Sequence, residues 1–308
     1  MKNLSPDWAE VCSERCGGTG GALRPWKMER KVNAMSRNAT IALVQMDCVM
    51  LDKEANLQKA KAFIEQAAQQ HADLICFPEM FSTGYSPALI GPKYIDVAEE
   101  PDGPTFCFLA ELAKKYSMYI VAPIVLKSEI PGLLYNGLIV ISRNGQLMGT
   151  YNKTHLWAGE RFWFRAGDRY PVFHMDFGTV GLMICYDGGF PEVSRILALS
   201  GAELILCPSA FPIRDKDMWD TYFGSRSLEN CCFVAGINRV GTEDDCYMFG
   251  NNKIYNYRGH LLAEAPVDDE FLLVQTVDLD DVAYHRATDV PYLQDRRVET
   301  YQKLTEMY

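Results

Sequence analysis

Cys185 ends an apolar run, GTVGLMIC, that predicts a buried strand, and Gly188 and Gly189 lie in the turn that follows it. A helix is expected to begin at Pro191. A helix N-terminus lowers the pKa of a nearby thiol, and backbone N–H groups there can hold an oxyanion. The paired glycines let a substrate approach the backbone closely. These features predict a nucleophilic cysteine, with a buried structural cysteine as the alternative.

Glu79 and Lys153 also follow predicted strands. Glu79 comes directly after ADLICF and Pro78, and Lys153 comes shortly after QLMGTY. Functional groups in α/β folds gather at the carboxyl ends of strands. Glu79 could therefore act as a general base, and the ammonium of Lys153 could stabilise a thiolate and a developing oxyanion. Taken singly, each residue is more commonly a solvated surface side chain.

The histidines and cysteines do not have the spacing of a metal site. The five histidines include no i, i+4 pair, and Cys12 and Cys16 have no second Cys or His pair nearby. Zinc sites need three or four such ligands, so we expect no metal. His155, two residues from Lys153, is the competing base for a Cys–His mechanism, although a structural role is the stronger expectation for it.

Apolar runs alternate with amphipathic segments from residue 39 onward. Helices are predicted over 53–70, 105–116, 191–200 and 217–230. Strands are predicted over 40–47, 72–77, 118–126, 137–142, 178–185, 203–208, 233–238 and 271–279. Several strands are continuously apolar, which indicates burial on both faces and an α/β fold with helices covering the sheets. The segments 71–80 and 201–210 share a small-acid-Leu-Ile order before a proline, which indicates either two halves of similar build or chance.

The composition excludes several kinds of partner. The formal net charge is -10, which repels phosphate backbones and anionic lipids, so neither nucleic acid nor a membrane surface is expected as a partner. No apolar run approaches the ~20 residues that span a bilayer, and the first residues lack the apolar core of a secretory signal. We therefore expect a cytoplasmic protein. Residues 1–38 are polar and glycine-rich, which predicts a flexible leader before a single domain over residues 39–308.

The chain resembles the nitrilase superfamily, the carbon–nitrogen hydrolases, from about residue 40 to residue 285. The resemblance lies in segments that keep the family's order, namely ALVQMD, ADLICFPEMFSTGY, GTYNKTHLWAGERFWFRAGD, VGLMICYDGGFPEVSR, GAELILCPSA and SLENCCFVAGINRVG. It implies a four-layer α-β-β-α sandwich with two mixed β-sheets. It also implies a homodimer or larger homo-oligomer, formed through the helices at 191–200 and 217–230.

The resemblance also assigns roles to single residues. Glu79 in FPEM, Lys153 in NKTHL and Cys185 in CYDGGFPE match the family's catalytic glutamate, lysine and cysteine. Glu160 in WAGERFWF matches a second glutamate that helps to position the substrate or the lysine, and the backbone N–H of Tyr186 falls where the family uses an oxyanion donor. The implied activity is hydrolysis of a non-peptide carbon–nitrogen bond in a small amide through a cysteine thioester, with no cofactor.

The residues after Cys185 favour an amide as the substrate. Nitrile-cleaving members usually have Cys-Trp-Glu there, and N-carbamoyl amino acid hydrolases tend to place an arginine after the nucleophile. Here Cys185 is followed by Tyr-Asp-Gly-Gly. We therefore expect neutral primary amides to be hydrolysed faster than N-carbamoyl amino acids. An N-carbamoyl amine or ureido hydrolase, a nitrilase and a non-catalytic binding homologue are the alternatives.

The pocket and its charges are less well specified by the sequence. Tyr85, Trp157 and Phe211 are predicted to line the pocket, and Phe81, Phe162 and Trp219 are further candidates. Arg195 is expected to pair with Asp187 or Glu192 on the same helix or turn. An arginine from elsewhere in the chain could still supply a carboxylate clamp, and the candidates are Arg161, Arg165, Arg214 and Arg239.

Overall fold

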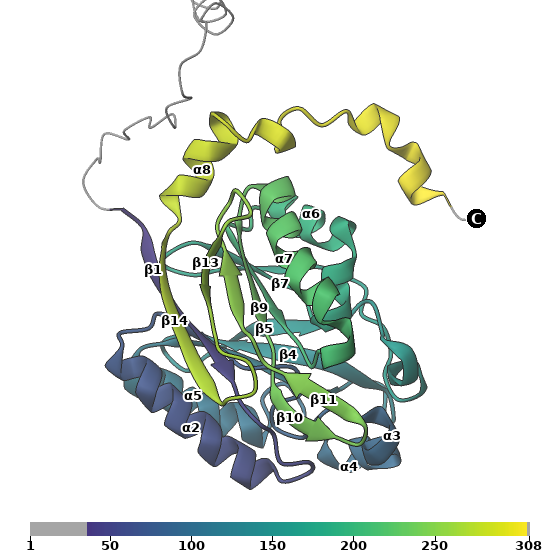
Figure 1. Cartoon of the computed structure of the whole chain (residues 1–308). Coiled ribbons are helices and arrows are strands. Elements are labelled where there is room, and N and C mark those ends of the chain that lie inside the picture. The colour runs from purple at the N-terminus through teal and green to yellow at the C-terminus, as the bar shows by residue number, and fades with distance from the viewer. Residues whose placement is uncertain (1–35, 307–308) are drawn as a thin grey trace, which may run out of the picture. The chain divides into compact units, whose positions relative to one another are not determined.

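A computed structural model describes residues 36–306 of the chain (Figure 1). The greater part of the predicted leader, with Cys12 and Cys16, lies outside the described residues. Arg37 and Asn38, which the sequence placed in the leader, belong to the folded unit that begins at Ser36. Asn38 opens the first strand, and the Arg37 guanidinium lies 2.7 Å from both Glu203 and Asp280.

Two six-stranded mixed sheets form the centre of this unit. The first has the order β14–β1–β2–β3–β4–β5, and its strands are β1 (Asn38–Gln45), β2 (Leu74–Cys76), β3 (Tyr119–Lys127), β4 (Leu134–Ile141), β5 (Leu147–Asn152) and β14 (Phe271–Asp278). The second has the order β13–β12–β9–β8–β7–β6, and its strands are β6 (Val172–His174), β7 (Thr179–Leu182), β8 (Leu204–Pro208), β9 (Phe233–Ile237), β12 (Lys253–Tyr255) and β13 (Leu261–Glu264). A separate hairpin consists of β10 (Val240–Glu243) and β11 (Cys246–Phe249).

The helices form the outer layers. The longer ones are α2 (Lys53–Gln69), α5 (Pro104–Tyr116), α6 (Pro191–Leu199), α7 (Lys216–Asn230) and α8 (Asp280–Ala287), and the short ones are α3 (Pro87–Ile90) and α4 (Tyr94–Val97). Asp52 caps α2 by accepting a hydrogen bond from the Ala55 N–H at 3.0 Å, and Pro191 occupies the first turn of α6. No helix within residues 36–306 is long and apolar enough to cross a bilayer.

Alternating side chains of β1 separate the layers. Ile41 and Leu43 pack with Leu182 of the second sheet, whereas Ala42 and Val44 pack into the cluster that holds α2 and α5. Figure 1 shows α2 and α5 on the outer face of the first sheet, and α6 and α7 beside the second. The predicted four-layer α-β-β-α sandwich with two mixed sheets is confirmed. The predicted dimer through α6 and α7 stays a prediction, as does the cytoplasmic location.

The two sheets share one pairing pattern. From β14 to β5 the pairs run antiparallel, parallel, parallel, antiparallel, antiparallel, and the pairs from β6 to β13 follow the same sequence. Strands β2 and β8 occupy matching places, and they lie within the similar segments 71–80 and 201–210. The similarity therefore reflects two halves of like build, and it brings the carboxyl ends of these strands together: the Glu79 N–H lies 3.4 Å from the Ser209 carbonyl oxygen.

Candidate active site

Cys185 lies in a tight turn beyond β7. The strand ends at Leu182 rather than at Cys185 as predicted, because the chain enters the 3-10 turn Cys185–Gly189. Cys185 has φ 48°, a left-handed conformation that is costly for a side chain with a Cβ atom. From α7, the Arg226 guanidinium donates to the carbonyl oxygens of Gly188 and Gly189, each at 3.0 Å. These bonds hold the turn in a shape that presents the thiol at its tip.

The buried carboxylate of Asp187 ties this turn to the segment that carries Lys153. Its Oδ2 accepts hydrogen bonds from the Ile184 N–H at 3.0 Å and the Tyr151 hydroxyl at 2.6 Å. Its Oδ1 accepts from the Thr154 hydroxyl at 2.8 Å and the His155 N–H at 2.9 Å. The turn that carries Cys185 and the segment that carries Lys153 are therefore both hydrogen-bonded to the Asp187 carboxylate.

Glu79 is fully buried at the end of β2. Its Oε1 accepts hydrogen bonds from Lys153 Nζ at 2.8 Å and Asn136 Nδ2 at 2.7 Å. Its Oε2 accepts from the Ala210 N–H at 2.8 Å. A buried carboxylate requires this degree of hydrogen bonding, and the three donors come from three different parts of the chain. The side chain is consequently held in one orientation.

Lys153 is also fully buried and lies between two carboxylates. Besides its contact with Glu79, its Nζ lies 2.7 Å from Glu160 Oε1. An ammonium has three N–H donors, and the third has no acceptor among residues 36–306. Burial alone would lower the pKa of Lys153, but the carboxylates of Glu160 and Glu79 raise it well above its usual value. The lysine is therefore a permanent cation with one unused donor.

Glu160 connects this charge cluster to the pocket wall. Its Oε1 accepts further hydrogen bonds from the Tyr85 hydroxyl at 2.7 Å and Asn136 Nδ2 at 3.4 Å, and its Oε2 accepts from the Trp157 N–H at 3.0 Å. Burial raises the pKa of Glu160, and the nearby Lys153 ammonium opposes that shift. Glu160 thus orients Lys153 and two aromatic residues at the same time.

The environment of Cys185 raises the pKa of the thiol, whereas the sequence predicted that a helix N-terminus would lower it. Burial, followed by the negative charge of Glu79, raises the pKa of the thiol well above its usual value, although Lys153 and the Ala210 N–H oppose the shift. The helix N-terminus that was expected to lower this pKa begins at Pro191, six residues later. Within residues 36–306 no hydrogen bond joins the thiol to Glu79 or Lys153. The thiol is therefore neutral at neutral pH and needs a base to become a nucleophile.

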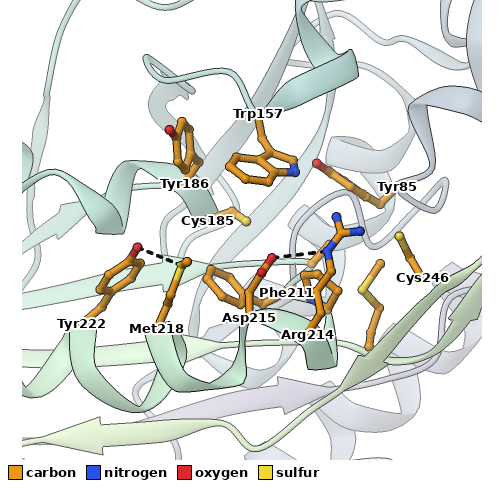
Figure 2. Close-up of a pocket in the computed structure, with 13 residues that line it drawn as sticks. Tyr85, Trp157, Cys185, Tyr186, Phe211, Arg214, Asp215, Met218, Tyr222 and Cys246 are labelled. Atoms are coloured by element: carbon orange, nitrogen blue, oxygen red, sulfur yellow. Dashed lines mark hydrogen bonds and ion pairs between the residues drawn. The ribbon is translucent and has the colours of Figure 1, made fainter.

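A pocket opens at Cys185 between aromatic and apolar side chains (Figure 2). Its wall includes Tyr85, Trp157 and Phe211, as the sequence suggested, and it encloses a volume of about 60 Å³. A neighbouring cavity of about 190 Å³ shares part of this wall. The other three aromatic candidates lie elsewhere: Phe81 and Trp219 are buried in the core, and Phe162 is 86% exposed.

The model of the carbon-nitrogen hydrolase family matches residues 40–287. The chain belongs to the carbon–nitrogen hydrolase family. A probable nitrilase of Schizosaccharomyces pombe is 36% identical over 270 residues, covering 86% of this chain and 98% of the relative. A citrullinase of Francisella tularensis is 32% identical over 289 residues, covering 88% and 99%. A solved mutant of the Nesterenkonia AN1 amidase, from the nitrilase superfamily, has a TM-score of 0.77 at 27% identity and covers 89% of this chain and 99% of that one.

These comparisons identify a nitrilase-superfamily enzyme that acts on carbon–nitrogen bonds other than peptide bonds. Within this carbon–nitrogen hydrolase the predicted residues Glu79, Lys153 and Glu160 lie in one hydrogen-bonded cluster, and Cys185 lies beside it at the pocket. The Tyr186 N–H, the predicted oxyanion donor, has no acceptor among residues 36–306. No group of three metal-ligating side chains occurs in the same part of the chain.

Two expectations about neighbouring residues have different outcomes. His155 Nδ1 lies 2.8 Å from Asp187 Oδ1, and its ring stacks on Phe190 with centroids 3.8 Å apart, which is a structural role. The expected pairing of Arg195 with Asp187 or Glu192 is wrong. Arg195 instead donates to the Glu229 carbonyl oxygen at 2.6 Å, because α7 packs beside α6 and offers that oxygen.

Three groups of the site were not predicted from the sequence. They are the Asn136 side chain, the Asp187 carboxylate in its anchoring role, and the Ala210 N–H. Asn136 interrupts the apolar run of β4, and a polar residue in such a run is a usable signal of a buried hydrogen bond. Asp187 gave a weaker signal, because an acidic residue in a turn is usually solvated. Backbone donors such as that of Ala210 leave no trace in the sequence.

We expect Asp187→Asn to lower both stability and turnover. Each Asp187 oxygen accepts a backbone N–H, from Ile184 or His155, so an amide NH₂ in either orientation would face a donor. One such unsatisfied pair costs about 1–3 kcal/mol. Urea unfolding and kcat should show both losses, whereas Asp168→Asn, at a side chain that is 85% exposed, should show neither. Unchanged kcat in Asp187→Asn would contradict the anchoring role.

Proposed function

We propose that this chain hydrolyses a small amide through a thioester on Cys185. Glu79 takes the thiol proton as the sulfur attacks the amide carbon. Lys153 and the Tyr186 N–H hold the resulting oxyanion. Glu79 then gives the proton to the departing ammonia or amine, which breaks the carbon–nitrogen bond and leaves the thioester. Water, deprotonated by Glu79, attacks the thioester and releases the carboxylic acid and the thiol.

One observation carries this proposal: a fully buried carboxylate and a fully buried ammonium with a spare donor lie beside a buried thiol whose pKa is raised. A neutral thiol requires a general base, and Glu79 is the carboxylate whose charge acts most strongly on it. A developing oxyanion requires donors that are already in place. The third N–H of Lys153 and the N–H of Tyr186 are two such donors.

The comparisons bear on the substrate only through the names of the relatives. An amidase, a citrullinase and a probable nitrilase resemble the chain, and their names refer to different carbon–nitrogen bonds. We favour the amide because Tyr-Asp-Gly-Gly follows Cys185 rather than Trp-Glu or an arginine-bearing turn. A ureido compound and a nitrile are the alternatives, and a single assay distinguishes all three.

We expect ammonia release to be fastest from butanamide when it is compared with N-propylurea and butyronitrile, which are also uncharged. Glu79→Gln should slow the reaction by about 10²-fold or more, because it removes proton transfer with little change in volume. Glu299→Gln, at a side chain that is 61% exposed, should have the wild-type rate. A carbamoyl compound or nitrile that is hydrolysed about tenfold faster than the amide would overturn the choice of substrate.

A further inference from the structure

Arg214 lies where the two cavities meet. It belongs to the short turn Ile213–Asp215 before α7, and it lines both the cavity at Cys185 and the neighbouring one. Figure 2 shows its guanidinium extending toward Tyr85 and Trp157, with Cys185 close by. Its side chain is 61% exposed, and its Nε lies 3.6 Å from Asp215 Oδ2. Asp215 is its one acidic partner within residues 36–306, so most of its N–H donors are available to a ligand.

Carboxylates line the same two cavities as Arg214. Asp215 lines the inner cavity, and Asp244 and Asp245, in the turn between β10 and β11, line the outer one. Glu243 also lines the outer cavity, but its buried carboxylate accepts the N–H groups of Tyr85 and Ser86, each at 2.8 Å, and pairs with Arg239. Among the described lining residues this leaves the exposed carboxylates of Asp244 and Asp245, and the Asp215 carboxylate that contacts the Arg214 guanidinium.

The other arginines near the site are already engaged. Arg226 bonds the carbonyl oxygens of Gly188 and Gly189, and these glycines offer no side chain of their own. Arg239 is fully buried beside Glu243. Arg161 bonds the Leu156 carbonyl oxygen at 3.3 Å. Of the candidate cations named from the sequence, Arg214 is the one with a place in the wall of both cavities.

Much of the wall of the cavity at Cys185 is apolar. Trp157, Phe211, Met218 and Met248 form much of it. A hydrocarbon segment suits such a wall, and a charged group beside it would lose its water without compensation. The site therefore fits a molecule with a reacting amide at one end, a short methylene chain, and charges at the other end.

We infer that the substrate is the side-chain amide of an α-amino acid, a molecule that carries a carboxylate and an ammonium on one carbon. The carboxylate binds Arg214, and the ammonium faces Asp215 and the two aspartates of the β10–β11 turn. A lone carboxylate would meet three like charges, and a lone ammonium would meet the guanidinium. The zwitterion alone satisfies both. This inference rests on the proposed amide hydrolysis and names its substrate class.

Four amides with the same separation between the amide and the carbon that can carry the charges measure the contribution of each charge separately. Glutamine carries both, glutaramic acid lacks the ammonium, 4-aminobutanamide lacks the carboxylate, and butanamide lacks both. Asparagine and the next longer homologue of glutamine cover other chain lengths. We expect kcat/KM to be highest for one of the zwitterions, by about tenfold over either singly charged amide, because each charge contributes hydrogen bonds to an oppositely charged group of the wall.

Arg214→Gln should reduce the ratio of kcat/KM for that zwitterion to kcat/KM for butanamide by about tenfold, mainly through KM. Arg169→Gln, at an 83% exposed side chain, should leave this ratio unchanged. If butanamide is hydrolysed but no zwitterion is preferred, or if Arg214→Gln leaves the ratio as it was, the inference is wrong and the proposed function stands. If none of the amides releases ammonia, both are wrong.

Discussion

Cys185→Ala is expected to reduce turnover by about 10⁴-fold or more while the fold persists. The variant lacks the atom that forms the thioester, and the remaining cluster of Glu79 and Lys153 cannot replace a covalent step. The side chain is 7% exposed, and loss of one buried sulfur should cost roughly 1 kcal/mol of stability. Ammonia release, the urea midpoint and circular dichroism measure these quantities separately.

A trapped intermediate identifies the nucleophile directly. Wild-type protein quenched during turnover should contain an acyl group on the peptide that carries Cys185. Cys207 is a matched control, because it is also buried and its sulfur lies 3.7 Å from the Cys185 carbonyl oxygen. Cys207→Ala should remain active. An acyl group found on Cys207, or on Cys246 in the pocket wall, would refute the assignment.

Alkylation of the same thiol tests the role of Glu79. Since the pKa of Cys185 is raised, little thiolate exists at neutral pH, and iodoacetamide should modify Cys185 faster as the pH increases. Glu79→Gln removes the base beside the thiol and also the negative charge that raises the pKa of the thiol. We expect slower modification at pH 7 because the loss of proton transfer outweighs the lower pKa, and faster modification would contradict the role of Glu79 as the base. Peptide mapping must separate Cys185 from Cys107, which is exposed and reacts on its own.

Lys153→Met is expected to be the most damaging of the charge changes. It leaves Glu79 and Glu160, both fully buried, without the ammonium that neutralises them. Removal of one member of a buried ion cluster costs about 3–5 kcal/mol. The oxyanion also loses its charged donor, which should lower kcat by about 10³-fold. Lys303→Met, at a side chain that is 82% exposed, should affect neither quantity.

The stability of Lys153→Met should decrease as the pH rises. A carboxyl group whose pKa is higher in the folded state stabilises the fold while it is protonated and loses that contribution as the pH rises through the folded-state value. The pKa of Glu160 is already raised by burial, and removal of Lys153 takes away the main opposing charge. The variant should therefore lose stability from about pH 4.5 upward, more steeply than the wild type. Equal slopes in urea unfolding between pH 5 and 8 would contradict this account.

The sequence predicted the positions of the chemical groups better than the bonds that hold them. Glu79 and Lys153 could be found because they follow β2 and β5, whose ends lie at one edge of a sheet. Their hydrogen-bond partners come from distant segments, as Asn136 and the Ala210 N–H illustrate. Two predictions that considered only residues near in sequence were wrong. One assigned Arg195 a partner on its own helix or turn, and the other allowed the α6 N-terminus to decide the pKa of Cys185, where burial and Glu79 have the larger effects.

The pairing of β1 with β14 delays completion of the first sheet until residues 271–278 have been synthesised. Asn38 pairs with Asp278 and Gln45 with Phe271, so β1 is synthesised long before the strand that it pairs with at this edge. Until then the first sheet has an open edge along β1, with unpaired N–H and C=O groups that attract other chains. The half that contributes Glu79 and Lys153 thus matures after the half that contributes Cys185 has left the ribosome. The yield of folded protein during expression should therefore depend on whether a chaperone or another segment covers the β1 edge before β14 is synthesised.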